Sequence, residues 1–342
     1  MKKNSEIPAQ WQRRDFVKFS SGLAILLGLP QLSSAGERKT NDKLPAPKQP
    51  LPLVDARFPC RIADGIWLIT DKRISLVPNI GIVEGDDAVL VIDSGINSAL
   101  GKNVLAAARA IAGKRKIILT ITHAHPEHTF GAQAFKGETK IYYNRQQRDY
   151  LAQNGENLLK GFRQLLPPEQ LKLLEDVKIM LPDEIYDGKS ASLNLGNRKV
   201  LFQTWGTAHS PGDQIITIPD QKVIFAGDLI EERKFPIVPF YPPMIQQGDI
   251  NLKTWENALI EITAQKPHII IPGHGNLGGT EIAMQVVDYF KDTRKMVAEY
   301  KGKKTLDSMI VKQLEPIVQS HYPTWEQDEF IAPALRFLVQ ET

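Results

Sequence analysis

The sequence is poor in cysteine, and this absence limits how the chain can be stabilised. Its 342 residues include one cysteine, Cys60. A single thiol cannot form an internal disulfide, and it excludes a zinc site built from several cysteines. Arg61 is the only activating charge beside it, so we interpret Cys60 as a small, buried or semi-exposed thiol near the start of the fold.

The chain also carries little net charge beyond its first 35 residues. The formal charge is +3, and residues 1–35 account for all of it, because they hold five lysines and arginines against two acidic residues. A neutral body lacks the electrostatic field that draws proteins to nucleic acid, so we expect no nucleic-acid partner. We find no internal repeat and no low-complexity tract.

The N-terminal segment has an apolar run, but a short one. Residues 19–29 fall well below the ~20 residues of a membrane-spanning helix. Arg13 and Arg14 precede the run and resemble the twin-arginine export motif, and Ser33-Ser34-Ala35 supplies small residues for cleavage. The sequence therefore predicts export by the twin-arginine machinery, cleavage after Ala35, and a periplasmic or otherwise exported protein. A retained anchor and an amphipathic helix of the mature fold are the alternatives.

After the leader, residues 36–60 hold five prolines and read as a linker that cannot form a helix. Strands and helices then alternate. The predicted strands are Ile66 to Thr70, Leu76 to Val83, Ala88 to Ile92, Lys116 to Ile121, 198–204, 214–218, 222–226 and His268 to Ile271. The predicted helices are 97–112, 145–178 with a break at Pro167-Pro168, 251–264, 279–300 and a tail over 304–340.

Strands in two groups, with helices after each group, predict two sheets packed face to face and covered by helices. We assign the main domain to residues 61–300 and a helical C-terminal tail to 301–342. The helical insertion at about 145–178 could form a lid or cover a sheet. The apolar stripe of the tail could pack on the core or on another subunit, so the oligomeric state stays open.

Three histidines within six residues are the densest chemical feature of the chain: His123-Ala-His125-Pro-Glu127-His128. They follow a predicted buried strand and so lie on the loop at its C-terminal end, where layered α/β folds build their sites. The first two imidazoles can point toward one ion, and the third can turn toward a second. Imidazole and carboxylate are usual ligands of zinc.

Three further ligand candidates follow predicted strands downstream. They are His209, Asp228 and His274, and glycines lie close to each of them, as a tight backbone around an ion requires. His268 and His321 have no glycine-flanked loop, and we interpret them as ordinary surface or polar residues. The pattern as a whole predicts a metal centre.

These motifs, in this order, resemble those of the metallo-β-lactamase superfamily over roughly residues 61–300. The first resembles its His-x-His-x-Asp-His signature, and Asp93 matches an early aspartate that is usually structural. The resemblance implies an α/β (α+β) fold, a four-layer αββα sandwich. The leader, Pro78-Asn79-Ile80-Gly81 and the helical tail further resemble a periplasmic branch described as SoxH-like or quinoprotein-relay zinc metallohydrolases.

Carried over residue by residue, the resemblance implies one or two zinc ions per chain, with iron as an alternative. The implied ligands are His123, His125 and His209 for the first ion, Glu127, His128 and His274 for the second, and Asp228 shared by both. A hydroxide held between the metals would attack an electrophilic carbon or phosphorus. Asp228 or Glu127, the implied catalytic residues, would orient it and help to move its proton.

Glu127 departs from the family pattern, which has aspartate at this position. Its extra methylene moves the carboxylate by about a bond length, whereas metal–ligand distances tolerate only ~0.2 Å. The backbone compensates, or the second site is weak, altered in metal preference or empty. We interpret the charges that follow Asp228, from Glu231 to Lys234, mainly as solvated loop residues. Lys234 or Tyr241 could instead stabilise an oxyanion, and Phe235 to Pro243 could form a pocket wall.

The sequence thus predicts a metal-dependent hydrolase of a small ester, thioester, lactone, β-lactam or related substrate. Asp228 stands where several zinc β-lactamases carry a cysteine, which favours glyoxalase II-like and other non-lactamase branches. Two alternatives remain open. One is iron-dependent oxidation of persulfides on the same fold, and the other is a non-catalytic accessory protein that binds metal or sulfur.

Overall fold

The computed structural model describes residues 56–239, 250–303 and 306–341. The predicted export signal, the first part of the proline-rich linker and Tyr241 lie outside these ranges. Cys60 opens the first strand and is exposed, so the expectation of a buried or semi-exposed thiol is wrong. No helix among the described residues is long and apolar enough to cross a membrane.

The first sheet has seven strands, which lie side by side in chain order. They are β1 (Cys60–Ala63), β2 (Ile66–Ile69), β3 (Ile80–Glu84), β4 (Ala88–Ile92), β5 (Lys116–Thr120), β6 (Lys140–Asn144) and β7 (Glu184–Tyr186). The strands from β4 to β7 run parallel, and the earlier pairs are antiparallel. Every residue of β4 is buried, as its continuous apolar sequence predicts for a central strand covered on both faces.

The second sheet has five strands in the order β12-β11-β10-β9-β8. They are β8 (Ser190–Asn194), β9 (Lys199–Thr207), β10 (Pro211–Ile218), β11 (Val223–Glu231) and β12 (Ile269–His274). Strands β8 to β11 form antiparallel pairs, whereas β11 and β12 run parallel. The helix α5 (Leu252–Ala264) connects β11 to β12, because a parallel pair needs a crossover.

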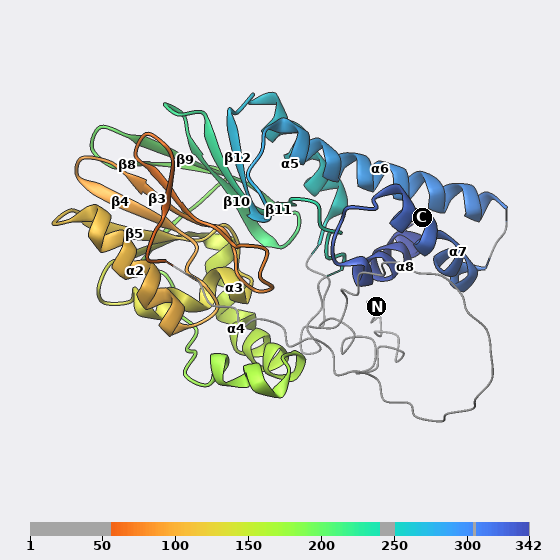
Figure 1. Cartoon of the computed structure of the whole chain (residues 1–342), viewed down its shortest axis with the longest axis horizontal. Helices are drawn as coiled ribbons and strands as arrows, with labels where there is room; N and C mark the ends of the chain where they lie inside the picture. The colour runs from red at the N-terminus through yellow and green to blue at the C-terminus, as the bar shows by residue number, and fades with distance from the viewer. Residues whose placement is uncertain (1–55, 240–249, 304–305, 342) are drawn as a thin grey trace, which may run out of the picture. The chain divides into compact units, whose positions relative to one another are not determined.

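Helices cover the outer faces of both sheets (Figure 1). The helices α2 (Ser98–Ala112) and α4 (Arg145–Leu165) lie on the first sheet, and α5 and α6 (Thr280–Gly302) lie on the second. Between the sheets is a core of interlocking apolar side chains, among them Leu68, Leu90, Phe202, Ile216 and Phe225. The predicted four-layer αββα sandwich is therefore confirmed.

The sequence pattern does not predict the shortest strands of the two sheets. β1, β6, β7 and β8 have three to five residues each, and β8 alternates between exposed and half-buried positions. Such segments carry little periodic signal and gain most of their stability from neighbouring strands. The start of the predicted helix 97–112 agrees with the structure, where Asn97 caps α2 by accepting a hydrogen bond from the Leu100 amide at 2.9 Å.

The chain ends in two helices, α7 (Asp307–His321) and α8 (Ile331–Glu341), which pack on α6. The remaining short elements are α3 (Pro126–Thr129), η2 (Phe130–Ala134), η3 (Pro168–Leu174) and η4 (Asp328–Phe330). Arg73 ties the segment between α7 and η4 to the end of β11, because its guanidinium lies 2.8 Å from both Glu232 and Glu326. Phe235 and Trp325 stack beside this link with ring centroids 5.4 Å apart.

Candidate metal centre

The predicted ligands come from the ends of four strands and from one short helix. β5 ends at Thr120 and delivers His123, and His125, Glu127 and His128 follow at α3. The turn between β9 and β10 holds His209, while Asp228 lies in β11 and His274 ends β12. Residues from both sheets therefore meet at one edge of the sandwich.

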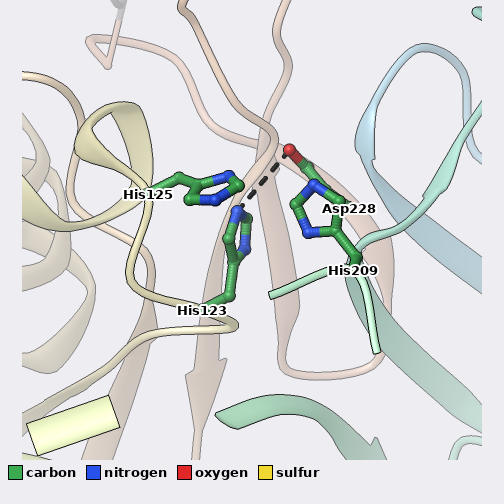
Figure 2. A group of neighbouring side chains, drawn as sticks. All are labelled: His123, His125, His209 and Asp228. Atoms are coloured by element: carbon green, nitrogen blue, oxygen red, sulfur yellow. Dashed lines mark ion pairs between the residues drawn. The ribbon is translucent and has the colours of Figure 1, made fainter. Parts of the chain in front are cut away.

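All seven predicted ligands gather in two overlapping clusters. His123, His125, His209 and Asp228 form the first, and Glu127, His128, Asp228 and His274 form the second. In each cluster one ligand atom per residue lies within 4.8 Å of all the others, and every member is buried. Figure 2 shows the first cluster, with the His123 ring directed at the Asp228 carboxylate. Asp228 belongs to both clusters, as the resemblance implied.

The donor set fits divalent metal ions. The Nε2 atoms of His123, His128 and His274 lie 3.6, 3.3 and 3.8 Å from the Asp228 carboxylate. Two ligands bound at about 2.1 Å to one tetrahedral ion are about 3.4 Å apart. His123 Nε2 and Glu127 Oε2 are fully buried and make no hydrogen bond with any described residue. Buried polar atoms normally have a hydrogen-bond partner. These two atoms have none, and a bound metal ion would supply the missing partner.

Asp93 orients the second cluster from behind. Its carboxylate lies 2.9 Å from His128 Nδ1 and accepts hydrogen bonds from the Thr122 amide and hydroxyl at 2.7 and 2.9 Å. The hydroxyl of Thr122 also lies 3.1 Å from His123 Nδ1. With their Nδ1 atoms engaged in this way, His123 and His128 present Nε2 to the metal. Asp93 is in neither cluster, which agrees with the structural role expected from the sequence.

A second aspartate, Asp213, stands behind the first cluster. Its Oδ1 atom lies 3.5 Å from His209 Nδ1, and it accepts hydrogen bonds from the amide and hydroxyl of Ser210 at 2.7 and 2.6 Å. The ring of Trp255 packs against His209 with centroids 5.1 Å apart. The sequence motif around His209 contains Asp213, but its i+4 spacing on a turn did not reveal this role.

The loop around His274 is held by the segment that joins β2 to β3. Asn79 donates from its side-chain amide to the carbonyls of Pro272 and Gly275 at 3.1 and 2.8 Å. Asp71 accepts a hydrogen bond from the Gly275 amide at 2.8 Å. Only glycine fits at position 273, because a Cβ atom there would lie 1.8 Å from Asp228 Oδ1. Gly273 therefore leaves the space that the Asp228 carboxylate occupies.

Burial and mutual proximity shift the pKa values of these groups in the metal-free protein. Burial lowers the pKa of His274 to about 3 and holds those of His123 and His125 well below the usual range. Burial opposes ionisation of Asp228 too, yet the neighbouring imidazoles, His128 first, bring its pKa well below normal. Burial also disfavours a charged His209, but Asp213 outweighs it and raises the pKa of His209 to about 9.

Two of the charges after Asp228 are not solvated, contrary to the sequence-based interpretation. Glu231 is 5% exposed and Lys234 is 4% exposed. Burial, and then the negative charge of Asp228, raises the pKa of Glu231 to about 8. Glu232 and Arg233 do behave as partly exposed residues, and they form an ion pair with each other. The C-terminal tail pairs with this segment, because the backbones of Lys234 and Glu326 form an isolated β-bridge.

Comparisons with known proteins agree with this geometry. A sequence profile of the metallo-beta-lactamase superfamily matches residues 75–274. A metallo-beta-lactamase from Pontibacter korlensis is similar in structure, with a TM-score of 0.53 and 16% identity over 68% of this chain and 97% of that one. TMB-1 is similar at a TM-score of 0.51 and 17% identity, over 68% of this chain and 95% of its own.

DIM-1 metallo-beta-lactamase, solved after exposure to ceftazidime, gives a TM-score of 0.51 at 15% identity, covering 70% of this chain and 97% of its own. At such low identity these structures establish the fold alone. The profile, by contrast, spans more than half of the chain and ends on His274, the last ligand of the second cluster. The chain belongs to the metallo-beta-lactamase superfamily.

Proposed function

We propose that this protein is an exported, zinc-dependent hydrolase of a small ester, thioester, lactone or related substrate. The observation that carries the proposal is the pair of buried clusters that share Asp228. Histidine and carboxylate donors of this kind suit zinc, and a shared carboxylate could coordinate two neighbouring ions at once. Export and the relationship to the periplasmic SoxH-like branch stay predictions from the sequence.

The roles of the chain's own residues follow from their positions. Zinc, when bound, lowers the pKa of a coordinated water and polarises the substrate's acyl oxygen. His123, His125 and His209 would hold one ion, and Glu127, His128 and His274 the other. The carboxylates of Asp228 and Glu127 lie among these ligands, where they can orient the attacking water and accept its proton.

Elemental analysis of the purified protein tests the metal, and a panel of esters, thioesters and lactones tests the reaction. We expect two zinc ions per chain, and hydrolysis that a chelator abolishes and added zinc restores. One zinc ion would limit the mechanism to a single metal. Bound iron with oxygen uptake on persulfides would overturn the hydrolase in favour of sulfur oxidation. Full metal loading without turnover of any substrate would instead favour an accessory role.

A further inference from the structure

Glu231 is a buried carboxylate beside the metal centre that belongs to neither cluster. It is the last residue of β11, and its backbone pairs with that of His274 on β12. Its charge interacts electrostatically with Asp228 first, then with Lys234, His209 and Glu127, so members of both clusters surround it at electrostatic range. Each cluster already has four ligands without it. Metal binding therefore does not explain why a carboxylate is buried here.

The register of β11 is irregular on the approach to Glu231. Asp228 and Glu231 are three residues apart and would point to opposite faces of a regular strand. The pairing of β11 with β12 shifts between Gly227 and Glu231, which allows both carboxylates to face the metal centre. The next residue, Glu232, turns away and binds Arg73 at 2.8 Å. Its amide donates to the His274 carbonyl at 2.9 Å, which holds this segment in place.

One oxygen of the Glu231 carboxylate has no hydrogen-bond donor among the described residues. Its Oε1 atom is fully buried and accepts no hydrogen bond from the part of the chain that the structure describes. Lys234, also buried, interacts with it electrostatically, yet the described residues include no ion pair between the two. A buried acceptor without a donor is costly, so such a group is retained where a ligand supplies the donor.

We propose that Glu231 is a specificity-determining residue, whose carboxylate accepts a hydrogen bond from an N–H or O–H group that the substrate carries next to the acyl carbon under attack. The inference rests on the proposed hydrolase function and adds the chemical class of substrate. The pKa of Glu231 is raised by burial to about 8 in the metal-free protein, and the positive charges of Lys234 and of bound metal ions would favour its ionised form. Glu231 acts by binding substrate and takes no part in holding the metal.

Three lactones test the proposal: γ-butyrolactone and its 2-amino and 2-hydroxy derivatives, which differ only in the donor beside the carbonyl. We expect the zinc-loaded protein to prefer a donor-bearing lactone. Glu231→Gln should reduce kcat/KM for that lactone by about 10- to 100-fold, mainly through KM, and change it little for the plain lactone. Preference for the amino lactone alone would identify an ammonium donor, and preference for both derivatives a neutral one. Glu232→Gln, which removes the neighbouring charge, should retain the preference.

Binding provides a readout that does not require turnover. Calorimetry with the unreactive lactams 3-amino-2-pyrrolidinone and 2-pyrrolidinone should show tighter binding of the amino lactam to the zinc-loaded protein, lost in Glu231→Gln at unchanged zinc content. Equal binding of both lactams, or an equal loss for all three lactones in the variant, would overturn the role of Glu231. If no lactone is hydrolysed but the lactams are still distinguished through Glu231, the hydrolase proposal fails and the binding role stands.

Discussion

The Nδ1 atom of His128 lies 2.9 Å from the Oδ2 atom of Asp93, and both side chains are buried. Asp93 holds this position with a backbone φ of 69°, a conformation that few residues other than glycine adopt. One aspartate therefore stores backbone strain while it orients a ligand of the second cluster and fixes Thr122 behind His123.

Replacing this aspartate should weaken the second cluster more than the first, because Asp93 contacts His128 directly and reaches His123 only through Thr122. Asp93→Asn keeps the size of the side chain and tolerates the same backbone angle, but it removes the charge that supports His128. We expect the affinity for the second metal ion to fall by about 10- to 100-fold. Competition with a chromophoric chelator measures it, and Asp86→Asn, which changes an exposed aspartate in the turn between β3 and β4, is the control. Equal losses in both variants would contradict an orienting role.

Asp213→Asn is the matched change behind the first cluster. Since Asp213 supports His209 and the turn at Ser210, its loss should weaken the first ion by about 10- to 100-fold. The second ion should be retained. The measurement is stepwise metal titration followed by elemental analysis. Loss of the same ion from both aspartate variants would show that the two clusters are not separately supported.

Glu127→Asp should reduce binding of the second ion, although aspartate is the residue the family pattern carries. The Glu127 oxygen already lies among the other ligand atoms in this backbone. A shorter side chain would withdraw it by about a bond length, far more than the ~0.2 Å that a metal–ligand distance tolerates. Metal content after dialysis decides the question. If the variant keeps two ions more firmly than the native protein, glutamate is the weaker ligand here.

Gly273→Ala should disrupt both clusters, because the added Cβ would lie 1.8 Å from Asp228 Oδ1 and displace the shared carboxylate. We expect loss of both ions in elemental analysis, with circular dichroism reporting whether the fold survives. Gly302→Ala is the control, since nothing lies within 4 Å of a Cβ placed there. Two ions retained in the Gly273 variant would mean that Asp228 does not bridge them.

Metal affinity at the first cluster should fall as the pH falls. Asp213 outweighs burial and raises the pKa of His209 to about 9 in the metal-free protein. Below that pH the ring carries a proton that a metal ion must displace, so the apparent affinity should drop by about tenfold per pH unit. His123 and His125 add no such dependence, because burial holds their pKa values well below the usual range. An affinity that stays constant from about pH 6.5 to about pH 8.5 would contradict this assignment.

The sequence by itself identified the candidate metal ligands that the structure brings together. Several ligands follow or end strands that are recognisable from a run of apolar residues, as His123 does after β5 and His274 at the end of β12. A local signal also located the start of α2, because Asn97 caps it through a hydrogen bond to Leu100, only three residues later in the sequence. Side-chain type and local spacing were sufficient for these features.

Only the tertiary structure decided which other charges serve the site. Glu231 and Lys234 read as solvated in a charged stretch, yet both are buried in the structure, where Lys234 pairs with the C-terminal tail and Glu231 pairs with His274 in an irregular strand register. The support of His128 by Asp93 joins residues 35 positions apart. Burial and long-range contact depend on how distant segments pack, and no local pattern in the sequence encodes them.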